Sequence, residues 1–220
     1  MPTSVEADRD AALTLFPLPP EIVRRLDIYA ALLRKWHKTI NLVSASTLPQ
    51  LWTRHIADSL QVQAALPDAK VWADLGSGGG FPGLVTAIRL AETPEARVHL
   101  IESDQRKCAF LREVSRETSA PVVIHNGRIE EIINHIDAPI DAISARALAP
   151  LPVLVGYAEG WLAKGAAGVF LKGQEAEQEV KALSLAGRYR IIAKSSVTAP
   201  VSRVLLVFDE AAQKTVAQRG

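Results

Sequence analysis

Apolar positions in the first part of the chain recur at the spacing of an α-helix. Between residues 21 and 40 they fall on one face, at Ile22, Leu26, Tyr29, Leu33, Trp36 and Ile40. This period predicts an amphipathic helix. Its outer face is basic, because it carries Arg24, Arg25, Arg34, Lys35 and Lys38. A second helix is expected after Thr47, with Arg54 and His55 on it.

After Pro67 the pattern changes to short apolar runs separated by helical segments. The runs are VWADL, ARVHLIES, PVVIHNGR, IDAISARAL and GAAGVFLKG, with a final pair at residues 189–197 and 203–208. Strands that alternate with helices predict an α/β, Rossmann-like fold. Such a fold has a mostly parallel sheet, helices on both faces, and ligands at the carboxyl ends of the strands.

Three parts of the chain are expected from these patterns. Residues 1–20 end in the Pro-rich letters FPLPP and are predicted to form a loose N-terminal arm. Residues 21–66 form the basic helical extension. Residues 67–220 form the Rossmann-like core as one compact unit.

Composition narrows the class of protein. Hydrophobic residues make up 48% of the chain, and the formal net charge of +1 gives no overall attraction to nucleic acid or to an anionic membrane. The acidic start lacks the features of a signal peptide, and no apolar run approaches the ~18 residues of a membrane span. We therefore expect a soluble, cytoplasmic protein. The single cysteine, Cys108, excludes an internal disulfide and a multi-cysteine zinc site and is expected in the core.

The letters VWADLGSGGGFPG combine a strand with a glycine-rich turn. Gly76 and Gly78 permit positive φ and a close approach of ligand atoms to the backbone. The G-x-G-x-x-G spacing of Gly78, Gly80 and Gly83 also fits a nicotinamide or flavin dinucleotide. Asp74 argues against that ligand, because a pyrophosphate would approach its carboxylate. S-adenosyl-L-methionine carries an ammonium and a sulfonium cation, and it suits an acid at the mouth of the loop.

The next strand ends in the letters HLIES, which place Glu102 and Ser103 at its carboxyl end. The two oxygens of Glu102 are well placed to accept hydrogen bonds from the 2′ and 3′ hydroxyls of a ribose. The alternative is that Glu102 caps the helix that contains Arg106 and Lys107. Capping and ribose binding are compatible.

Several longer segments carry a more specific signal. They are LRKWHKTINLVS and RHIADSL, followed by DLGSGGGFPG, LIESDQRKCAFL, NGRIEE, ISARALA and LKG. Together they resemble the bacterial 16S ribosomal RNA methyltransferase G family, also called glucose-inhibited division protein B. The resemblance runs from about residue 32 to residue 173, and the last forty residues match loosely.

This resemblance implies a reaction and a set of cofactor contacts. The reaction is transfer of a methyl group from S-adenosyl-L-methionine to N7 of a guanine, nucleotide 527, in the 530 loop of 16S ribosomal RNA. The partner is then 16S rRNA or the small ribosomal subunit. By motif, Gly76 and Phe81 line the cofactor, Ile129 and Glu130 border its adenine, and Arg146 closes the pocket.

The expected chemistry needs no catalytic side chain and no metal. N7 of guanine already presents a lone pair, so the enzyme has only to align it with the methyl carbon and sulfur. The chain also lacks the Asn/Asp-Pro-Pro-Tyr/Phe loop of many amino-group methyltransferases. Arg146 has a structural alternative, an ion pair with a carboxylate such as Asp141.

Contacts with the substrate are predicted mainly in the helical extension, and the protein is expected to be a monomer. The candidate residues are Arg34, Lys35, Lys38, Arg54, His55 and Lys172. A solvated helix face is the alternative for the basic residues, and core packing is the alternative for His55. Alternative functions are another S-adenosylmethionine-dependent RNA or small-molecule methyltransferase, a dinucleotide-dependent oxidoreductase, and a non-enzymatic RNA-binding assembly factor.

Overall fold

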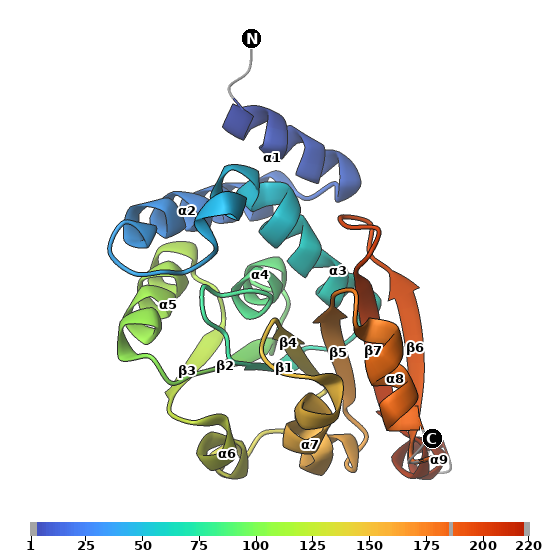
Figure 1. Ribbon diagram of the computed structural model, residues 1–220. Helices are drawn as coiled ribbons and strands as arrows, with labels where there is room; N and C mark the ends of the chain where they lie inside the picture. The colour runs from blue at the N-terminus through green and yellow to red at the C-terminus, as the bar shows by residue number, and fades with distance from the viewer. Residues whose placement is uncertain (1–3, 185–186, 218–220) are drawn as a thin grey trace.

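The protein is built around one seven-stranded sheet (Figure 1). The computed structural model describes residues 4–184 and 187–217, with side chains as far as residue 213. The strands are β1 Val71–Leu75, β2 Arg97–Glu102, β3 Val122–Asn126, β4 Ala142–Arg146, β5 Ala167–Lys172, β6 Tyr189–Ser195 and β7 Arg203–Asp209. Their order across the sheet is β3-β2-β1-β4-β5-β7-β6. The first five pair in parallel and β7 is antiparallel to both β5 and β6, which resolves the pairing of the C-terminal strands.

Helical segments cover both faces of this sheet. The α-helices are α1 Ser4–Leu15, α2 Pro20–His37, α3 Asp58–Ala65, α4 Gly83–Arg89, α5 Gln105–Thr118, α6 Ile129–Ile132, α7 Leu151–Leu162, α8 Ala176–Ser184 and α9 Glu210–Ala217. Shorter turns are the 3-10 helices η1 Ala45–Gln50 and η3 Ile133–His135, and the π-helix η2 Trp52–Ala57. Among the described residues no helix combines the length and the apolar character that a membrane crossing requires.

Alternation along β1 and its neighbours divides the core into two layers. Trp72 points to the face that holds α2, α3, α4 and α5, whereas Ala73 and Leu75 point to the face that holds α6, α7 and α8. Adjacent strand residues point to opposite faces, so the continuous apolar runs of the sequence fill both layers. In Figure 1 the first group of helices lies above the sheet, whereas α6 and α7 of the second group lie below it.

The predicted loose arm is wrong for the residues that the structure describes. Residues 4–15 form α1, which packs on η2, while residues 1–3 of the predicted arm lie outside the described part. The Asp8 carboxylate accepts hydrogen bonds from the backbone N–H groups of Trp52 and Thr53 and from the Thr53 hydroxyl. Arg9 makes a bidentate pair with Asp27 at 2.8 and 2.9 Å. These polar contacts and the burial of Ala12 dock a helix that has little apolar face of its own.

The helical extension shares one core with the sheet. Leu26 and Leu33 of α2 and Ile56 of η2 are fully buried in the same cluster as Trp72 of β1 and Leu100 of β2. The predicted second helix after Thr47 is broken into η1, η2 and α3, and Pro49 lies within the first of these segments. This extension therefore forms a wall above the carboxyl ends of the central strands.

Candidate active site

A cavity of about 660 Å³ lies at the carboxyl ends of β1, β2 and β4, between the sheet and the segment that joins α2 to η2. That volume is within the usual range of ligand sites. Its lining on the sheet side is Gly76, Ser77, Gly78, Gly79, Phe81, Ile101, Glu102, Ser103, Lys107, Gly127, Arg128, Ile129, Glu130, Arg146, Ala147, Leu148 and Tyr157. Its lining from the helical extension is Leu42, Val43, Ser44, Thr47 and His55.

The glycine turn after β1 forms the floor of this cavity. Gly76 and Gly78 have φ angles of +63° and +54°, in the region that side chains disfavour. A Cβ at Gly79 would lie 2.7 Å from the carbonyl oxygen of Leu42, so the turn packs closely against the extension. The hydroxyl of the buried Tyr29 donates a hydrogen bond to the Gly79 carbonyl. The extension thus holds the floor of the cavity from behind.

Asp74 does not lie at the mouth of the loop as the sequence suggested. It is fully buried under the turn, where its Oδ1 accepts a 2.6 Å hydrogen bond from the Ser144 hydroxyl. Its Oδ2 is buried without a hydrogen-bond partner among the residues that the structure describes, and a Cβ at Gly83 would lie 2.5 Å from it. Burial raises the pKa of Asp74 to about 6, against the opposing effect of the Ser144 hydrogen bond. Asp74 therefore anchors the loop from below, and its carboxylate is not part of the cavity lining.

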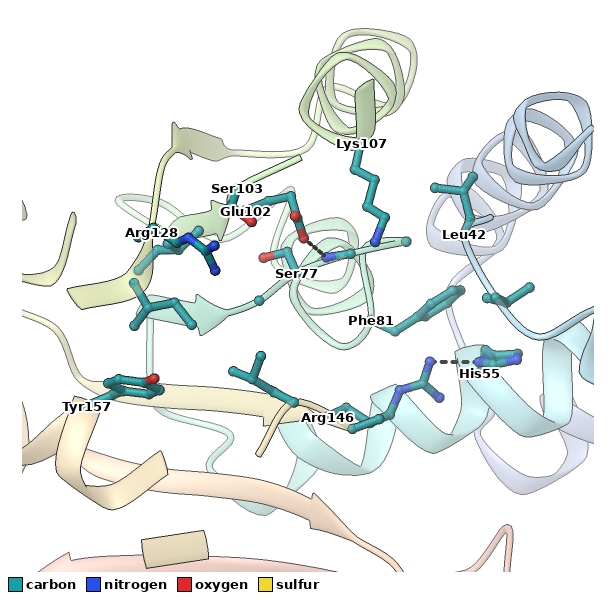
Figure 2. A pocket seen from close by; sticks show the side chains of 18 of the residues that line it. Leu42, His55, Ser77, Phe81, Glu102, Ser103, Lys107, Arg128, Arg146 and Tyr157 are labelled. Atoms are coloured by element: carbon teal, nitrogen blue, oxygen red, sulfur yellow. Dashed lines mark hydrogen bonds between the residues drawn. The ribbon is translucent and has the colours of Figure 1, made fainter. Parts of the chain in front are cut away.

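Glu102 lies in the cavity at the end of β2 and also organises the turn. Its Oε2 accepts from Gly78 N–H at 2.8 Å, and its Oε1 accepts from Asp104 N–H at 2.8 Å (Figure 2). Each carboxylate oxygen has a second lone pair for a ligand hydroxyl. The helix-cap alternative is wrong, because α5 is capped by Asp104, which accepts from Arg106 N–H and Lys107 N–H. Cys108 is buried on α5, as expected.

The opposite end of the cavity is formed by the loop that follows β3. Ile129 and Glu130 lie there together with Tyr157 of α7. The Tyr157 hydroxyl donates a 2.8 Å hydrogen bond to Glu130 Oε1. A hydrogen bond from the backbone lowers the pKa of Glu130 most, and the Tyr157 hydroxyl lowers it further. An apolar side chain beside two polar ones suits a flat heteroaromatic ring with polar edges.

Phe81, His55 and Arg146 form the wall nearest the helical extension. The guanidinium of Arg146 lies 4.9 Å from the centroid of the Phe81 ring, and the His55 and Phe81 rings are 5.0 Å apart. Arg146 donates to His55 Nδ1 at 2.7 Å and to the Arg54 carbonyl at 3.2 Å. Its carboxylate partner is Asp58, at 3.5 Å, and not the suggested Asp141. Figure 2 shows Arg146 and His55 side by side below Phe81.

His55 is held as a neutral imidazole. Burial lowers its pKa to about 3, and the positive charges of Arg146 and Arg54 act in the same direction. Because an arginine only donates, His55 Nδ1 is the acceptor and its proton is on Nε2. That nitrogen lies 2.8 Å from the Thr47 hydroxyl, to which it donates.

The structure brings together one group of predicted residues and separates another. All predicted cofactor residues line the one cavity, and so does His55: Gly76, Gly78, Phe81, Glu102, Ser103, Ile129, Glu130 and Arg146. Four basic candidates from the extension, Arg34, Lys35, Lys38 and Arg54, do not line it.

The remaining candidates differ in how free their charges are. Lys35 is 3.6 Å from Glu113, whereas Lys38 and Arg54 are exposed. Within the described part of the chain, the buried Nη2 of Arg34 has no hydrogen-bond partner. Lys172 is turned away from the cavity, because its Nζ pairs with Glu179 at 2.8 Å and donates to the Ala149 carbonyl at 2.9 Å.

Sequence reasoning missed several residues of the cavity. Lys107 and Arg128 reach it as cations, and no ion pair with either is found among the described residues. Lys107 is adjacent to the exposed Arg106 in the sequence. The sequence alone does not indicate which of these two basic residues reaches the cavity. The helix predicted over residues 105–117 already places Lys107 in its first turn, near the carboxyl ends of the strands. Tyr157 shares the otherwise apolar α7 with Glu159, and only Tyr157 of the two lines the cavity.

The residues present fit S-adenosyl-L-methionine. The glycine turn presents backbone to the cavity. A Cβ at Gly76 would lie 2.7 Å from the side chain of Leu148, which also lines the cavity. The Glu102 carboxylate offers acceptors at the end of β2, where a ribose lies in folds of this type. Glu130 and Tyr157 supply polar groups at the far end. The acceptors of Glu102 and Glu130 suit a ligand with hydroxyl and amino groups.

Sequence comparison identifies close relatives. Residues 22–203 match the family described as rRNA small subunit methyltransferase G. Ribosomal RNA small subunit methyltransferase G of Bradyrhizobium sp. strain BTAi1 is 53% identical over 176 residues, covering 80% of this chain and 79% of the relative. The protein of the same name from Parvibaculum lavamentivorans is 51% identical over 180 residues, covering 81% of this chain and 78% of the relative.

Solved structures share the fold at low sequence identity. An O-methyltransferase of Streptomyces achromogenes involved in tomaymycin synthesis, in complex with S-adenosylmethionine, matches with a TM-score of 0.59 and 19% identity, covering 94% of this chain and 100% of the other. An S-adenosylhomocysteine-bound methyltransferase of Podospora anserina matches with a TM-score of 0.64 and 13% identity, covering 96% and 98% of the two chains. These likenesses confirm the predicted Rossmann-like methyltransferase fold.

Proposed function

The chain belongs to the rRNA small subunit methyltransferase G family, and on this premise we propose that it methylates N7 of guanine 527 in the 530 loop of 16S rRNA. It is an S-adenosylmethionine-dependent methyltransferase. The observation that carries the proposal is that one cavity joins the glycine turn and Glu102 to a separate wall of Phe81, His55 and Arg146. Cofactor and target base need such adjoining compartments, because the transferred methyl group moves directly between them.

The cofactor compartment is supplied by the glycine turn, Glu102, Ile129 and Glu130. Phe81 and Arg146, which the family resemblance assigns to the cofactor, line the same cavity, and we place them where the cofactor and base compartments meet. When bound, S-adenosylmethionine supplies an electrophilic methyl group on its sulfonium. Glu102 accepts hydrogen bonds from the ribose, and Ile129 and Glu130 border the adenine. Ser103 lies beside Glu102 at the same strand end and lines the same compartment. The closed floor excludes water from below the reacting atoms.

The base compartment positions guanine and removes no proton. Phe81 is only 4% exposed and its ring lies against the Arg146 guanidinium, so it closes the wall of this compartment, into which a base turned out of the RNA would fit. His55 commits both ring nitrogens, one to Arg146 and the other to Thr47. It is therefore not available as a general base. N7 attacks through its existing lone pair, so alignment accounts for the rate.

Cations around the cavity give the RNA side of the proposal. We assign contacts with RNA phosphates to Lys107 and Arg128, which line the cavity, and to Lys38 and Arg54, which are exposed outside it. Arg34 and Lys35 extend this surface along α2. The partner is then 16S rRNA or the small ribosomal subunit, the protein acts as a monomer, and its place is the cytoplasm, where that RNA is found.

The decisive experiment is methyl transfer from labelled S-adenosylmethionine to 16S rRNA and to small subunits, followed by mapping of the labelled nucleotide. We expect label at N7 of a single guanine. Substrate RNA with 7-deazaguanine at that position lacks the acceptor nitrogen and keeps most of the shape of the base. Methylation that continued at this nucleotide would refute the assignment to N7.

The pH dependence of the chemical step gives an independent test. Under single-turnover conditions with saturating RNA and cofactor, the rate should be nearly constant from about pH 6.5 to 8.5, since no proton has to leave. A rate that rose about tenfold per pH unit across the acidic half would show an essential base. The acceptor would then be an amine or a hydroxyl group.

A further inference from the structure

A chain of polar side chains runs from the substrate-side segment of the cavity into the protein. It starts at Thr47, passes through His55 and Arg146, and ends at Asp58. Beyond Asp58 it continues to the loop after β6, because Asp58 Oδ1 accepts a 2.8 Å hydrogen bond from the Thr198 hydroxyl. The middle members are well shielded, with His55 at 8% exposure and the Arg146 side chain at 18%.

The π-helix η2 creates this arrangement. It carries Arg54 and His55, and Asp58 follows directly as the first residue of α3. Three successive contacts on Arg146 therefore come from one short stretch of backbone: the Arg54 carbonyl, His55 Nδ1 and the Asp58 carboxylate. The wider turn of a π-helix commonly occurs at functional sites. Here it sets the orientation of a side chain that belongs to β4, 91 residues after His55 in the chain.

We propose that His55 is a positioning residue for methyl transfer, acting through Arg146. Its Nδ1 lone pair fixes the guanidinium against Phe81, and its Nε2–H ties that guanidinium to the segment that contains Thr47. This role rests on the proposed function, since it concerns the compartment assigned to guanine. It deepens that function by naming the group that keeps an arginine in place beside the target base.

The chemistry of N7 explains why the position of Arg146 matters. Arginine donors bind readily to O6 and N7 of guanine. A hydrogen bond to N7 occupies the lone pair that has to attack the methyl carbon. While His55 accepts from Nη2, that donor is committed to the protein. Removal of the acceptor releases Nη2 and lets it compete for N7, which slows the chemical step.

Two isosteric substitutions separate the functions of the ring nitrogens. In His55→Asn the amide oxygen takes the place of Nδ1 and keeps an acceptor for Arg146. In His55→Gln the amide group lies near the place of Nε2, so the contact with Thr47 is kept and the acceptor for Arg146 is lost. We expect the single-turnover rate of His55→Asn to stay within about threefold of wild type and that of His55→Gln to fall about 10- to 100-fold. Cofactor affinity, measured by calorimetry, should change little in both variants.

Comparison of the two variants decides the proposal. Thermal unfolding of both would show whether either fails to fold, and the variants are compared only at temperatures where both are folded. Equal loss of rate in His55→Asn and His55→Gln, or an unchanged rate in His55→Gln, would overturn the positioning role. A rate that survives only in His55→Asn supports it.

A measurement without RNA keeps this inference separate from the proposed function. ¹⁵N NMR of the His55 ring in the free protein should show Nε2 protonated and Nδ1 as an unprotonated acceptor at pH 7. A proton on Nδ1 would overturn the proposal even if methylation occurs. If wild-type protein transfers no methyl group to 16S rRNA, the proposed function fails, and the ring tautomer still decides whether His55 holds Arg146.

Discussion

The two compartments of the cavity are built by different means. The cofactor compartment is made mostly of backbone: a glycine turn with positive φ at Gly76 and Gly78, braced by the carboxylate of Glu102. The base compartment is made of side chains from distant parts of the chain, with Arg146 held by His55, 91 residues earlier. The first is fixed by local geometry and the second by long-range polar contacts.

This difference predicts how each compartment responds to mutation. A side chain introduced into the glycine turn should abolish nearly all cofactor binding, because the positive φ angles of the turn disfavour any residue with a Cβ. Loss of one side chain from the base compartment should lower activity only in part, because the other contacts remain in place. The predictions that follow test this contrast, starting with the largest effect.

Valine at Gly78 should abolish cofactor binding. A β-branched residue is strained at a φ of +54°, and its side chain would enter the cavity. We expect S-adenosylmethionine affinity to fall at least about 100-fold, measured by calorimetry, because strain and obstruction act together. Gly156→Ala in α7 is the matched control, since a Cβ there meets nothing within 4 Å. A folded Gly78→Val protein with normal affinity would contradict the backbone floor.

Loss of the Glu102 carboxylate should weaken the cofactor compartment without destroying it. Glu102→Ala removes an acceptor for the ribose and releases the backbone N–H groups of Gly78 and Asp104. The expected loss of binding free energy is about 1 to 3 kcal/mol. Glu113→Ala on α5 serves as the control, because Glu113 accepts from Trp36 away from the cavity. Unchanged cofactor affinity in Glu102→Ala would assign this residue to the turn alone.

The basic face of α2 should affect RNA binding and leave the cofactor compartment intact. Replacing Arg34, Lys35 and Lys38 with alanine should lower rRNA affinity and reduce the slope of log K against log salt concentration by about 1 to 3. Lys35 should contribute least, because Glu113 lies 3.6 Å from it. Filter binding across a salt series, with calorimetry for the cofactor, makes the comparison. If affinity and slope both stay at wild-type values, this surface is a solvated helix face.

The smallest effect concerns stability and lies outside both compartments. His99 Nδ1 and His125 Nε2 are 2.9 Å apart on neighbouring strands, and the pKa of His99 is lowered to about 4 by burial first and by His125 second. Its ordinary pKa is 6.5. Between these values the unfolded chain binds a proton that the folded protein does not. The contribution of the neutral His99 to the free energy of unfolding is therefore fully present above about pH 6.5. It is lost as the pH falls toward 4.

Urea unfolding at pH 7 and pH 5 measures this loss. The protein should be less stable at pH 5, and His99→Gln should lose less between the two values because it has no proton to take up. His55, with a pKa lowered to about 3, contributes in the same direction and remains in the variant. An identical loss in wild type and His99→Gln would show that His99 does not control the acid sensitivity.

The sheet and the glycine turn that lines the cavity were predictable because their signals are local. Alternation within β1, the glycines after it and the acid that ends β2 all lie within a short stretch of sequence. The backbone of a strand-turn-helix unit is determined by its own residues, so its letters report its geometry. Asp74 was the exception: the letters placed it next to the turn, and only the packing of Ser144 shows that it points down into the core.

The base compartment and α1 could not be predicted in the same way. Asp8 meets the backbone of Trp52, 44 residues away, and Asp58 meets Thr198, 140 residues away. No spacing rule connects such positions, because their contact depends on how whole elements pack. The sequence identified His55 and Arg146 individually as candidates, but only the structure shows that they contact each other.

The contact between Asp58 and Thr198 has a consequence for the order in which contacts form while the chain is synthesised. Chains emerge from the ribosome with the N-terminus first, so η2 and the glycine turn are available long before the hairpin of β6 and β7. Until residue 198 has emerged, Asp58 lacks the hydroxyl that accompanies its contact with Arg146. A nascent or truncated chain that stops before residue 198 therefore has the residues of the glycine turn but lacks one of the contacts that hold Asp58 beside Arg146.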